Sequence, residues 1–377
     1  MADPALTIRR YLEQQRDAET RFLAELVKVP SDNPPGDCAA HAEAAAGLLE
    51  GLGFTVERHA VPDELVRANG MIACANLVVR RRFGDGPVVA LNAHGDVVPP
   101  GEGWSRDPYG AEIVDGWMYG RGVAVSKSDF ATYAFALLAL EAAAEAGTEL
   151  RGTVELHFTY DEEVGGEIGP RWLIEEGISN PELALGAGFS YAVVNAHNGC
   201  LHLEVQVDGR SAHAAMPWTG VDALEAATHI LGDLYAWRKT LAERRSDVAG
   251  IGSPQLTIGL IKGGINTNVV PDRVVFRLDR RMVPEELPEA VEAELAEVIH
   301  SAANDFPEAK VTVRRILLAR PLVPAEGGLR LTEILCRRAT EIMGETVAAK
   351  GVPLYTDARH YAEKDIPIVL YGAGPRT

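Results

Sequence analysis

The sequence predicts an α/β protein built from two domains, and three observations lead to this prediction. The chain has 377 residues, which is more than one compact core usually takes. In its first part, helical stretches alternate with short apolar runs that are typical of buried strands. After about residue 200, the strands alternate apolar and polar residues, as antiparallel strands with one exposed face do.

The elements of the first part follow from the spacing of its apolar residues. Amphipathic or alanine-rich stretches predict helices at 7–28, 37–52 and 130–144. Brief apolar runs bounded by turn residues predict buried strands at 76–80, 87–92 and 152–159. Polar residues that follow such strands lie at the C-terminal edge of a sheet, where ligands usually bind.

The stretch 200–314 is expected to form a second domain inserted in the first. Its order of strand, helix, strand, strand, helix and strand is typical of an antiparallel sheet with helices on one face. A helix from Leu331 and an apolar strand at 366–371 then return the chain to the first sheet. We therefore expect a discontinuous first domain over 1–199 and 315–377.

Composition excludes several classes of partner. Lysine and arginine number 36 against 54 aspartates and glutamates, and the net charge is -18. Such a charge repels phosphate backbones and anionic membrane surfaces, so we expect neither nucleic acid nor membrane as a partner. The four cysteines form no CxxC pair, and the N-terminus shows no apolar leader segment. Both observations predict a cytoplasmic protein.

Three polar clusters at the ends of predicted strands, at 93–96, 159–163 and 211–213, are candidates for chemistry. Asp96 follows His94 by two residues, so its carboxylate can orient the imidazole, as is usual for a metal-bound histidine. A backbone carbonyl could satisfy the same histidine instead. Asp161, Glu162 and Glu163 repel one another and raise each other's pKa unless a cation lies among them. A solvated acidic loop is the alternative.

These clusters belong to a longer series of motifs that resembles one protein family. It is the acetylornithine deacetylase, succinyl-diaminopimelate desuccinylase and bacterial glutamate carboxypeptidase family of dinuclear zinc hydrolases. The motifs that carry the resemblance are His94-Gly-Asp96, Tyr119-Gly-Arg-Gly122, Asp161-Glu-Glu163, Gly209-Arg-Ser-Ala-His213, Asn268-Val-Val-Pro271, Asp279-Arg-Arg281 and Asp357-Ala-Arg359. The resemblance implies a zinc-peptidase-like catalytic domain with a mixed sheet, interrupted by an α+β lid or dimerisation domain.

The resemblance also implies roles for the residues of the catalytic domain. His94 falls at a zinc ligand and Asp96 at the carboxylate that orients it. Glu162 falls at the general base, and Glu163 at a ligand of the second metal. Lys127, in the same motif series, could supply the missing positive charge in a site without metal and is a candidate for substrate binding.

Further roles fall on the lid domain and on the end of the chain. His213 matches the histidine that a family dimer offers to the active site of its partner subunit, where it stabilises the developing oxyanion. Asn268, Arg281 and Arg359 fall at positions that face the substrate and hold its carboxylate. For each of these three, a salt bridge or a turn is the alternative. The resemblance therefore implies a homodimer that acts on a small carboxylate-bearing molecule.

Several expected metal ligands are replaced in this sequence. The aspartate that bridges the two metals aligns with Val125, and a glutamate ligand aligns with Ala196. A last histidine is expected beyond the Gly372–Thr377 segment, where the sequence stops. Valine and alanine side chains donate no electron pair, while His197 and Asp129 are neighbours that could compensate. We expect one divalent metal ion, zinc, manganese or cobalt, or none.

Three functions are compatible with this pattern. The first is hydrolysis of an amide bond, in a peptide or an N-acyl amino acid, with Glu162 as general base. The second is a metal-independent enzyme that uses the same acids and Lys127 for acid–base chemistry. The third is a binding protein without catalysis. A chain that continues past Thr377 would restore a histidine but leave Val125 and Ala196 unchanged.

Overall fold

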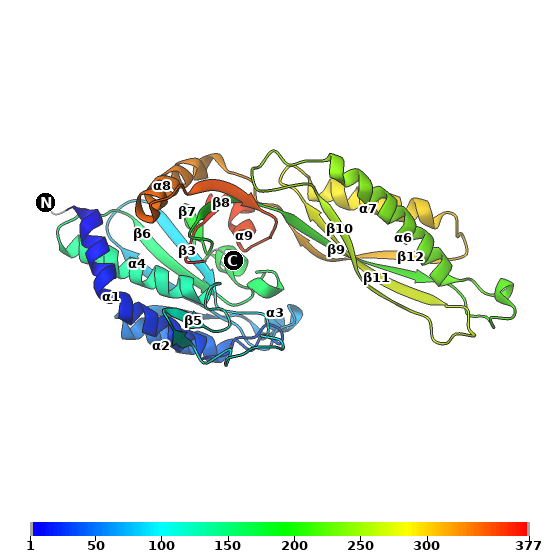
Figure 1. Ribbon diagram of the computed structural model, residues 1–377, viewed down its shortest axis with the longest axis horizontal. Helices are drawn as coiled ribbons and strands as arrows, with labels where there is room; N and C mark the ends of the chain where they lie inside the picture. Colours follow the sequence, from blue (N-terminus) through cyan, green and yellow to red (C-terminus); the bar gives the residue numbers. More distant parts are fainter. Residues whose placement is uncertain (1–2, 375–377) are drawn as a thin grey trace. The chain divides into compact units, whose positions relative to one another are not determined.

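The computed structural model describes residues 3–374, and contacts divide the chain into two compact units (Figure 1). The first unit holds the chain up to Asn195, residues 324–349 and the chain from Thr356 onward. The second unit holds Ala196–Val323 and Lys350–Tyr355. This is the mixed α/β architecture with an inserted antiparallel domain that the sequence predicts.

The first unit is built on a mixed sheet of eight strands in the order β1-β2-β6-β3-β7-β14-β8-β13. The central strands β6, β3, β7 and β14 run parallel, and β1 and β2 pair antiparallel at one edge. The strands are β1 (Val56–Ala60), β2 (Ala75–Arg82), β3 (Val88–His94), β6 (Thr153–Thr159), β7 (Leu183–Gly186), β8 (Ala192–His197), β13 (Ala348–Val352) and β14 (Ile368–Leu370), with a separate hairpin of β4 (Glu112–Val114) and β5 (Trp117–Tyr119).

Helices cover this sheet and complete its core. They are α1 (Pro4–Val27), α2 (Ala39–Gly51), α3 (Asp63–Ala68), α4 (Lys127–Glu145), the short 3-10 turn η1 (Glu162–Val164), α5 (Pro170–Glu175), α8 (Glu326–Met343) and α9 (Ala358–Ala362). The Asp3 side chain accepts a hydrogen bond from the Ala5 amide and so starts α1. Phe22 of α1 packs edge-on against Phe135 of α4, with ring centroids 6.0 Å apart. The two helices thereby share one apolar core with β3 and β6.

The second unit is a four-stranded antiparallel sheet in the order β10-β11-β9-β12, with helices α6 and α7 packed on one face. Its elements are β9 (Gly199–Asp208), η2 (Pro217–Thr219), α6 (Ala223–Thr240), η3 (Leu241–Glu243), β10 (Gln255–Gly263), β11 (Arg273–Met282), α7 (Pro288–Ala303) and β12 (Lys310–Ala319). Leu201, Leu203 and Val205 are buried against the helices, and the residues between them face the other side. The alternation in the sequence thus sets which face of β9 is buried.

The second unit extends beyond the expected 200–314. It begins at Ala196 and ends at Val323 because β12 pairs with β9 as far as the Ala319–Cys200 pair. Residues 350–355 also join it, where Gly351 donates a backbone hydrogen bond to Ala249. None of the helices within residues 3–374 combines the length and the apolar character needed to cross a membrane.

Candidate active site

The candidate site forms where β3 and β6 end side by side. These strands run parallel with His94 opposite Thr159, so the residues after Thr159 emerge beside the histidine. The 3-10 turn η1 then carries Glu162 and Glu163 toward it. One ligand atom of each of His94, Glu162 and Glu163 lies within 4.8 Å of the others. Residues 68 positions apart in sequence are brought together by parallel strand pairing.

Asp96 contacts both the His94 ring and the backbone of the two glutamates. Its Oδ1 lies 3.3 Å from His94 Nδ1, and the same nitrogen lies 2.9 Å from the Asp96 carbonyl oxygen. The Glu163 amide donates to Oδ2 at 3.1 Å and the Glu162 amide to Oδ1 at 3.3 Å. Asn33 Nδ2 also donates to Oδ2, at 2.9 Å. With Nδ1 engaged, the ring nitrogen left for a ligand is Nε2.

Electrostatics at the site favour a cation. Burial raises the pKa of Glu162 to about 7, and burial likewise raises the pKa of Glu163. Burial alone would lower the pKa of His94, but the charges of Glu162 and Asp96 outweigh it and hold that pKa well above its ordinary value. Acids kept from ionising by burial and by each other are stabilised when positive charge is placed among them. An imidazole and two carboxylates are ligands that zinc, manganese and cobalt accept.

Helix α9 braces the loop that carries the two glutamates. The Arg359 guanidinium donates to the carbonyl oxygen of Gly165, and His360 Nε2 lies 2.8 Å from the same oxygen. Arg359 also pairs with Glu167 at 3.4 Å, and its side chain is 2% exposed. This differs from the expected role of holding a substrate carboxylate, because the guanidinium is buried against backbone and Glu167.

Asp357 belongs to the motif Asp357-Ala-Arg359 and has no predicted role. Its carboxylate packs against Gly166, where an added Cβ would lie 2.2 Å from Oδ1. Burial, followed by the charges of Glu162 and Asp161, raises the pKa of Asp357 well above its ordinary value. Its place two residues before Arg359 in one motif was the available signal.

Lys127 differs from its expected role beside the substrate. Its ammonium group is fully buried and donates to the carbonyl oxygens of Val29 at 3.1 Å and Leu26 at 3.4 Å. It therefore closes the C-terminal end of α1, where unpaired carbonyl groups need donors. Burial lowers its pKa to about 8.

Val125 lies one residue before a contact with the His94 backbone. The next residue, Ser126, accepts a hydrogen bond from the His94 amide at 2.9 Å and donates one to the His94 carbonyl at 2.9 Å. Asp129, the expected compensating acid, instead accepts a hydrogen bond from the Ala373 amide at 2.8 Å. Burial raises the pKa of Asp129 to about 7.

Ala196 is not placed at this site. It packs with Ile251 and Val283, and His197 beside it hydrogen-bonds to the Asn198 carbonyl. The strand that pairs with β3 on its other side is β7, and the Ala187 amide just after it donates to the Asn92 carbonyl at 2.8 Å. The residue beside the site at the end of the neighbouring strand is therefore Ala187, which also lacks a donor atom.

The remaining expected residues lie in the second unit. His213 and Asn268 are neighbours on two exposed loops, since the Ala214 amide donates to the Asn268 carbonyl at 3.0 Å. Arg281 forms an ion pair with Asp279 at 2.9 Å and stacks over Tyr355 at 5.6 Å. His213 and Asn268 are thus brought together, whereas Arg281 has an acidic partner of its own.

Comparison with known proteins identifies the family of this chain. The family model described as peptidase family M20/M25/M40 matches residues 90–377. The chain belongs to this family. The resemblance seen in the sequence is thereby confirmed.

Individual relatives carry hydrolase names. Succinyl-diaminopimelate desuccinylase of Zymomonas mobilis is 33% identical over 229 residues, which cover 57% of this chain and 56% of the relative. Acetylornithine deacetylase of Myxococcus xanthus is 29% identical over 335 residues, covering 88% and 82%. The fold matches an M20 metallo-carboxypeptidase of Sulfolobus solfataricus (TM-score 0.73, 18% identity, covering 95% and 92%) and human carnosine dipeptidase 1 (0.71, 18%, 100% and 92%).

Proposed function

We propose that this protein hydrolyses an amide bond, in a peptide or an N-acyl amino acid, of a small substrate that carries a carboxylate. The observation that supports it most is the convergence of His94, Glu162 and Glu163 within 4.8 Å at the C-terminal edge of parallel strands. Family membership supports the same class of reaction, and the names of the two relatives given above denote cleavage of an amide bond.

The donor atoms fit one divalent ion. His94 and Glu163 would hold it, with Glu162 beside them, and zinc, manganese and cobalt all accept such ligands. A bound ion of this kind polarises a carbonyl oxygen. Two protein ligands, with no donor at Val125, hold an ion less firmly than the three or four of an ordinary zinc site. We therefore expect a site that chelators empty readily.

The chain's own residues perform the proton transfers. Glu162 removes a proton from water through its carboxylate and passes it to the leaving amine. Its pKa of about 7 suits both steps near neutral pH. Asp96 keeps the His94 ring in one orientation and holds the backbone of Glu162 and Glu163. His213 of a second copy would stabilise the oxyanion, as the resemblance implies.

Substitution Glu162→Gln tests the general base. We expect kcat on a panel of N-acyl amino acids and dipeptides to fall by about 10²–10⁴-fold, while the bound metal measured by mass spectrometry stays unchanged. Glu149→Gln is the matched control, because the Glu149 side chain is 75% exposed and pairs only with its neighbour Arg151 in the contacts described. Undiminished kcat in Glu162→Gln would contradict the assignment of Glu162 as the general base. Loss of bound metal in this variant would show that Glu162 is a metal ligand instead.

A metal-independent enzyme is the second candidate, and one observation favours it. Burial raises the pKa of both Asp161 and Glu162 to about 7, so protons can occupy this cluster in place of a cation. Activity that survives a chelator would support this alternative over the metal-assisted one. Ligand binding without turnover by any of the panel would support a binding protein.

We also propose that the protein is a cytoplasmic homodimer. None of its four cysteines, all within the described residues, forms a disulfide, as a reducing compartment favours. Strand β10 lies at the edge of the second unit's sheet and exposes Leu260 and Ile261 by 51% and 54%. A second copy that covers this edge would shield both residues from water.

A further inference from the structure

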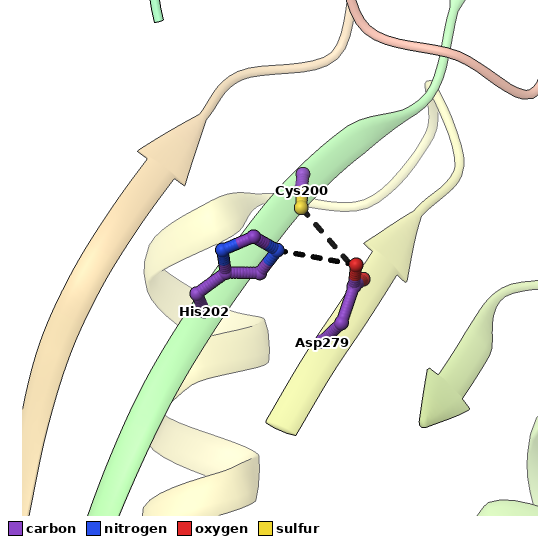
Figure 2. A group of neighbouring side chains, drawn as sticks. All are labelled: Cys200, His202 and Asp279. Atoms are coloured by element: carbon purple, nitrogen blue, oxygen red, sulfur yellow. Dashed lines mark hydrogen bonds and ion pairs between the residues drawn. The ribbon is translucent and has the colours of Figure 1, made fainter. Parts of the chain in front are cut away.

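A second group of side chains of the types that ligate metals lies in the second unit, on the sheet face opposite the helices (Figure 2). Cys200 and His202 are two residues apart on β9 and therefore point to the same side. In the antiparallel register Asp279 of β11 stands opposite His202, and Arg281 stands opposite Cys200. The four side chains form a two-by-two block on one face.

The distances in this block suit coordination. Cys200 Sγ lies 3.7 Å from Asp279 Oδ1, and His202 Nε2 lies 3.1 Å from Asp279 Oδ2. All three donor groups lie within 4.8 Å of one another. Tetrahedral zinc with bonds of about 2.3 Å to sulfur and about 2.0 Å to nitrogen and oxygen separates its donors by about 3.3–3.5 Å. Small side-chain rotations would bring these atoms onto one ion.

Cys200 distinguishes this group from the other polar pairs on the same face. Further along β9, Glu204 pairs with Arg277 and Arg314, as acids and arginines do across many exposed sheet faces. In the cross-strand pair of Cys200 and Arg281, a thiol stands where the pair of Glu204 and Arg277 has a carboxylate. His202 Nε2 lies 3.1 Å from Asp279 Oδ2, and the Arg281 guanidinium donates to both Asp279 oxygens. These contacts orient the carboxylate.

We propose that Cys200, His202 and Asp279 bind one divalent ion of the zinc type, at a site formed entirely by β9 and β11. Binding replaces the thiol proton by a sulfur–metal bond and releases that proton to solvent, so the thiolate offsets one charge of the ion, while the ion and Arg281 share the Asp279 carboxylate. His202 and Asp279 are 35% and 28% exposed and give the ion access, whereas Cys200 is buried. The ion would tie the first residues of β9 to the last residues of β11.

Cobalt titration of the full chain tests this site, because Co²⁺ bound to a thiolate absorbs in the near ultraviolet. The group of His94, Glu162 and Glu163 contains no sulfur and gives no such band. With thiols kept reduced by a phosphine, we expect the band to saturate at one ion per chain. Excess Zn²⁺ should abolish it, since zinc prefers the same ligands.

Matched variants decide the outcome. Cys200→Ser should abolish the band, and His202→Gln or Asp279→Asn should weaken cobalt binding by about 10–100-fold. Cys336→Ser, at a half-buried cysteine of α8, should leave it unchanged. If Cys200→Ser fails to fold by circular dichroism, the two other variants decide alone, because their side chains are partly exposed. No band in wild type, or an undiminished band in the folded variants, would overturn the proposal.

Discussion

Asp96 is the residue on which the geometry of the candidate site depends most. It is fully buried, and its two oxygens receive hydrogen bonds from two backbone amides and from Asn33. It also lies next to His94 Nδ1. A buried carboxylate with several donors is stable in the interior because each lone pair that leaves water finds a partner. One side chain thus sets both the histidine ring and the glutamate backbone.

Substitution Asp96→Asn tests this role at the residue scale. The amide nitrogen of asparagine accepts no hydrogen bond, so at least one buried amide loses its partner and His94 loses a negative neighbour. We expect metal affinity and kcat/KM to fall by about 10–100-fold and the free energy of unfolding to fall by about 1–3 kcal/mol. Isothermal titration, steady-state kinetics and urea unfolding measure the three changes. Asp85→Asn, at a side chain 96% exposed, should change none of them.

The element that positions the acids is the turn η1 with the glycines that follow it. Gly166 has φ of +72° and leaves no room for a side chain, because an added Cβ would lie 2.2 Å from Asp357 Oδ1 and 2.7 Å from His360 Nε2. Helix α9 thus approaches the loop closely only because glycine stands there. The contact explains how Arg359 reaches the Gly165 carbonyl.

Gly166→Ala and Gly177→Ala form a matched pair at the element scale. Gly177 has a similar φ of +66°, but nothing lies within 4 Å of an added Cβ. Gly177→Ala should therefore lower the free energy of unfolding by only about 1 kcal/mol, because alanine is strained in the left-handed backbone conformation. Gly166→Ala adds a steric clash and should cost about 3 kcal/mol. Equal losses in urea unfolding would show that α9 does not pack against this loop.

The junction of α1 and α4 provides a pH-dependent test. Burial lowers the pKa of Lys127 from 10.5 to about 8, so between these pH values the unfolded chain binds more protons than the folded one. Stability contributed by this group therefore rises with pH across that window, by up to about 3 kcal/mol. Urea unfolding at several pH values should show that the free energy of unfolding of wild type rises relative to that of Lys127→Met between pH 8 and 10.5. Parallel curves would contradict the buried placement of this ammonium.

At the scale of the whole molecule, the proposed dimer depends on the exposed edge of the second unit. Ile261→Lys puts a charge on β10, and lysine on an edge strand opposes pairing with another chain. We expect light scattering to show dimers for wild type and monomers for this variant. Ile72→Lys, at a residue 60% exposed in the first unit, is the control and should remain dimeric. A variant Ile261→Lys that stays dimeric would place the interface elsewhere.

Much of the fold could be predicted from local patterns. The helix predicted at 130–144 is observed as α4 at Lys127–Glu145, and the alternation after residue 200 is observed in β9. These predictions succeed because periodicity is a property of neighbouring residues. The Ala196 alignment failed because β7, and not β8, pairs with β3, and strand order is not encoded in any single strand.

The sequence by itself determined the family, the α/β class and the pairing of His94 with Asp96, since two residues on one strand end need only local geometry. The tertiary structure alone decided the partners of Lys127 and Arg359. Both side chains are long and charged, and their acceptors lie 98 and 194 residues away along the chain. Burial forces such a group onto whichever carbonyl or carboxylate the packing brings near. The group of Cys200, His202 and Asp279 could likewise not be predicted from the sequence, because only the register of β9 and β11 brings these residues together.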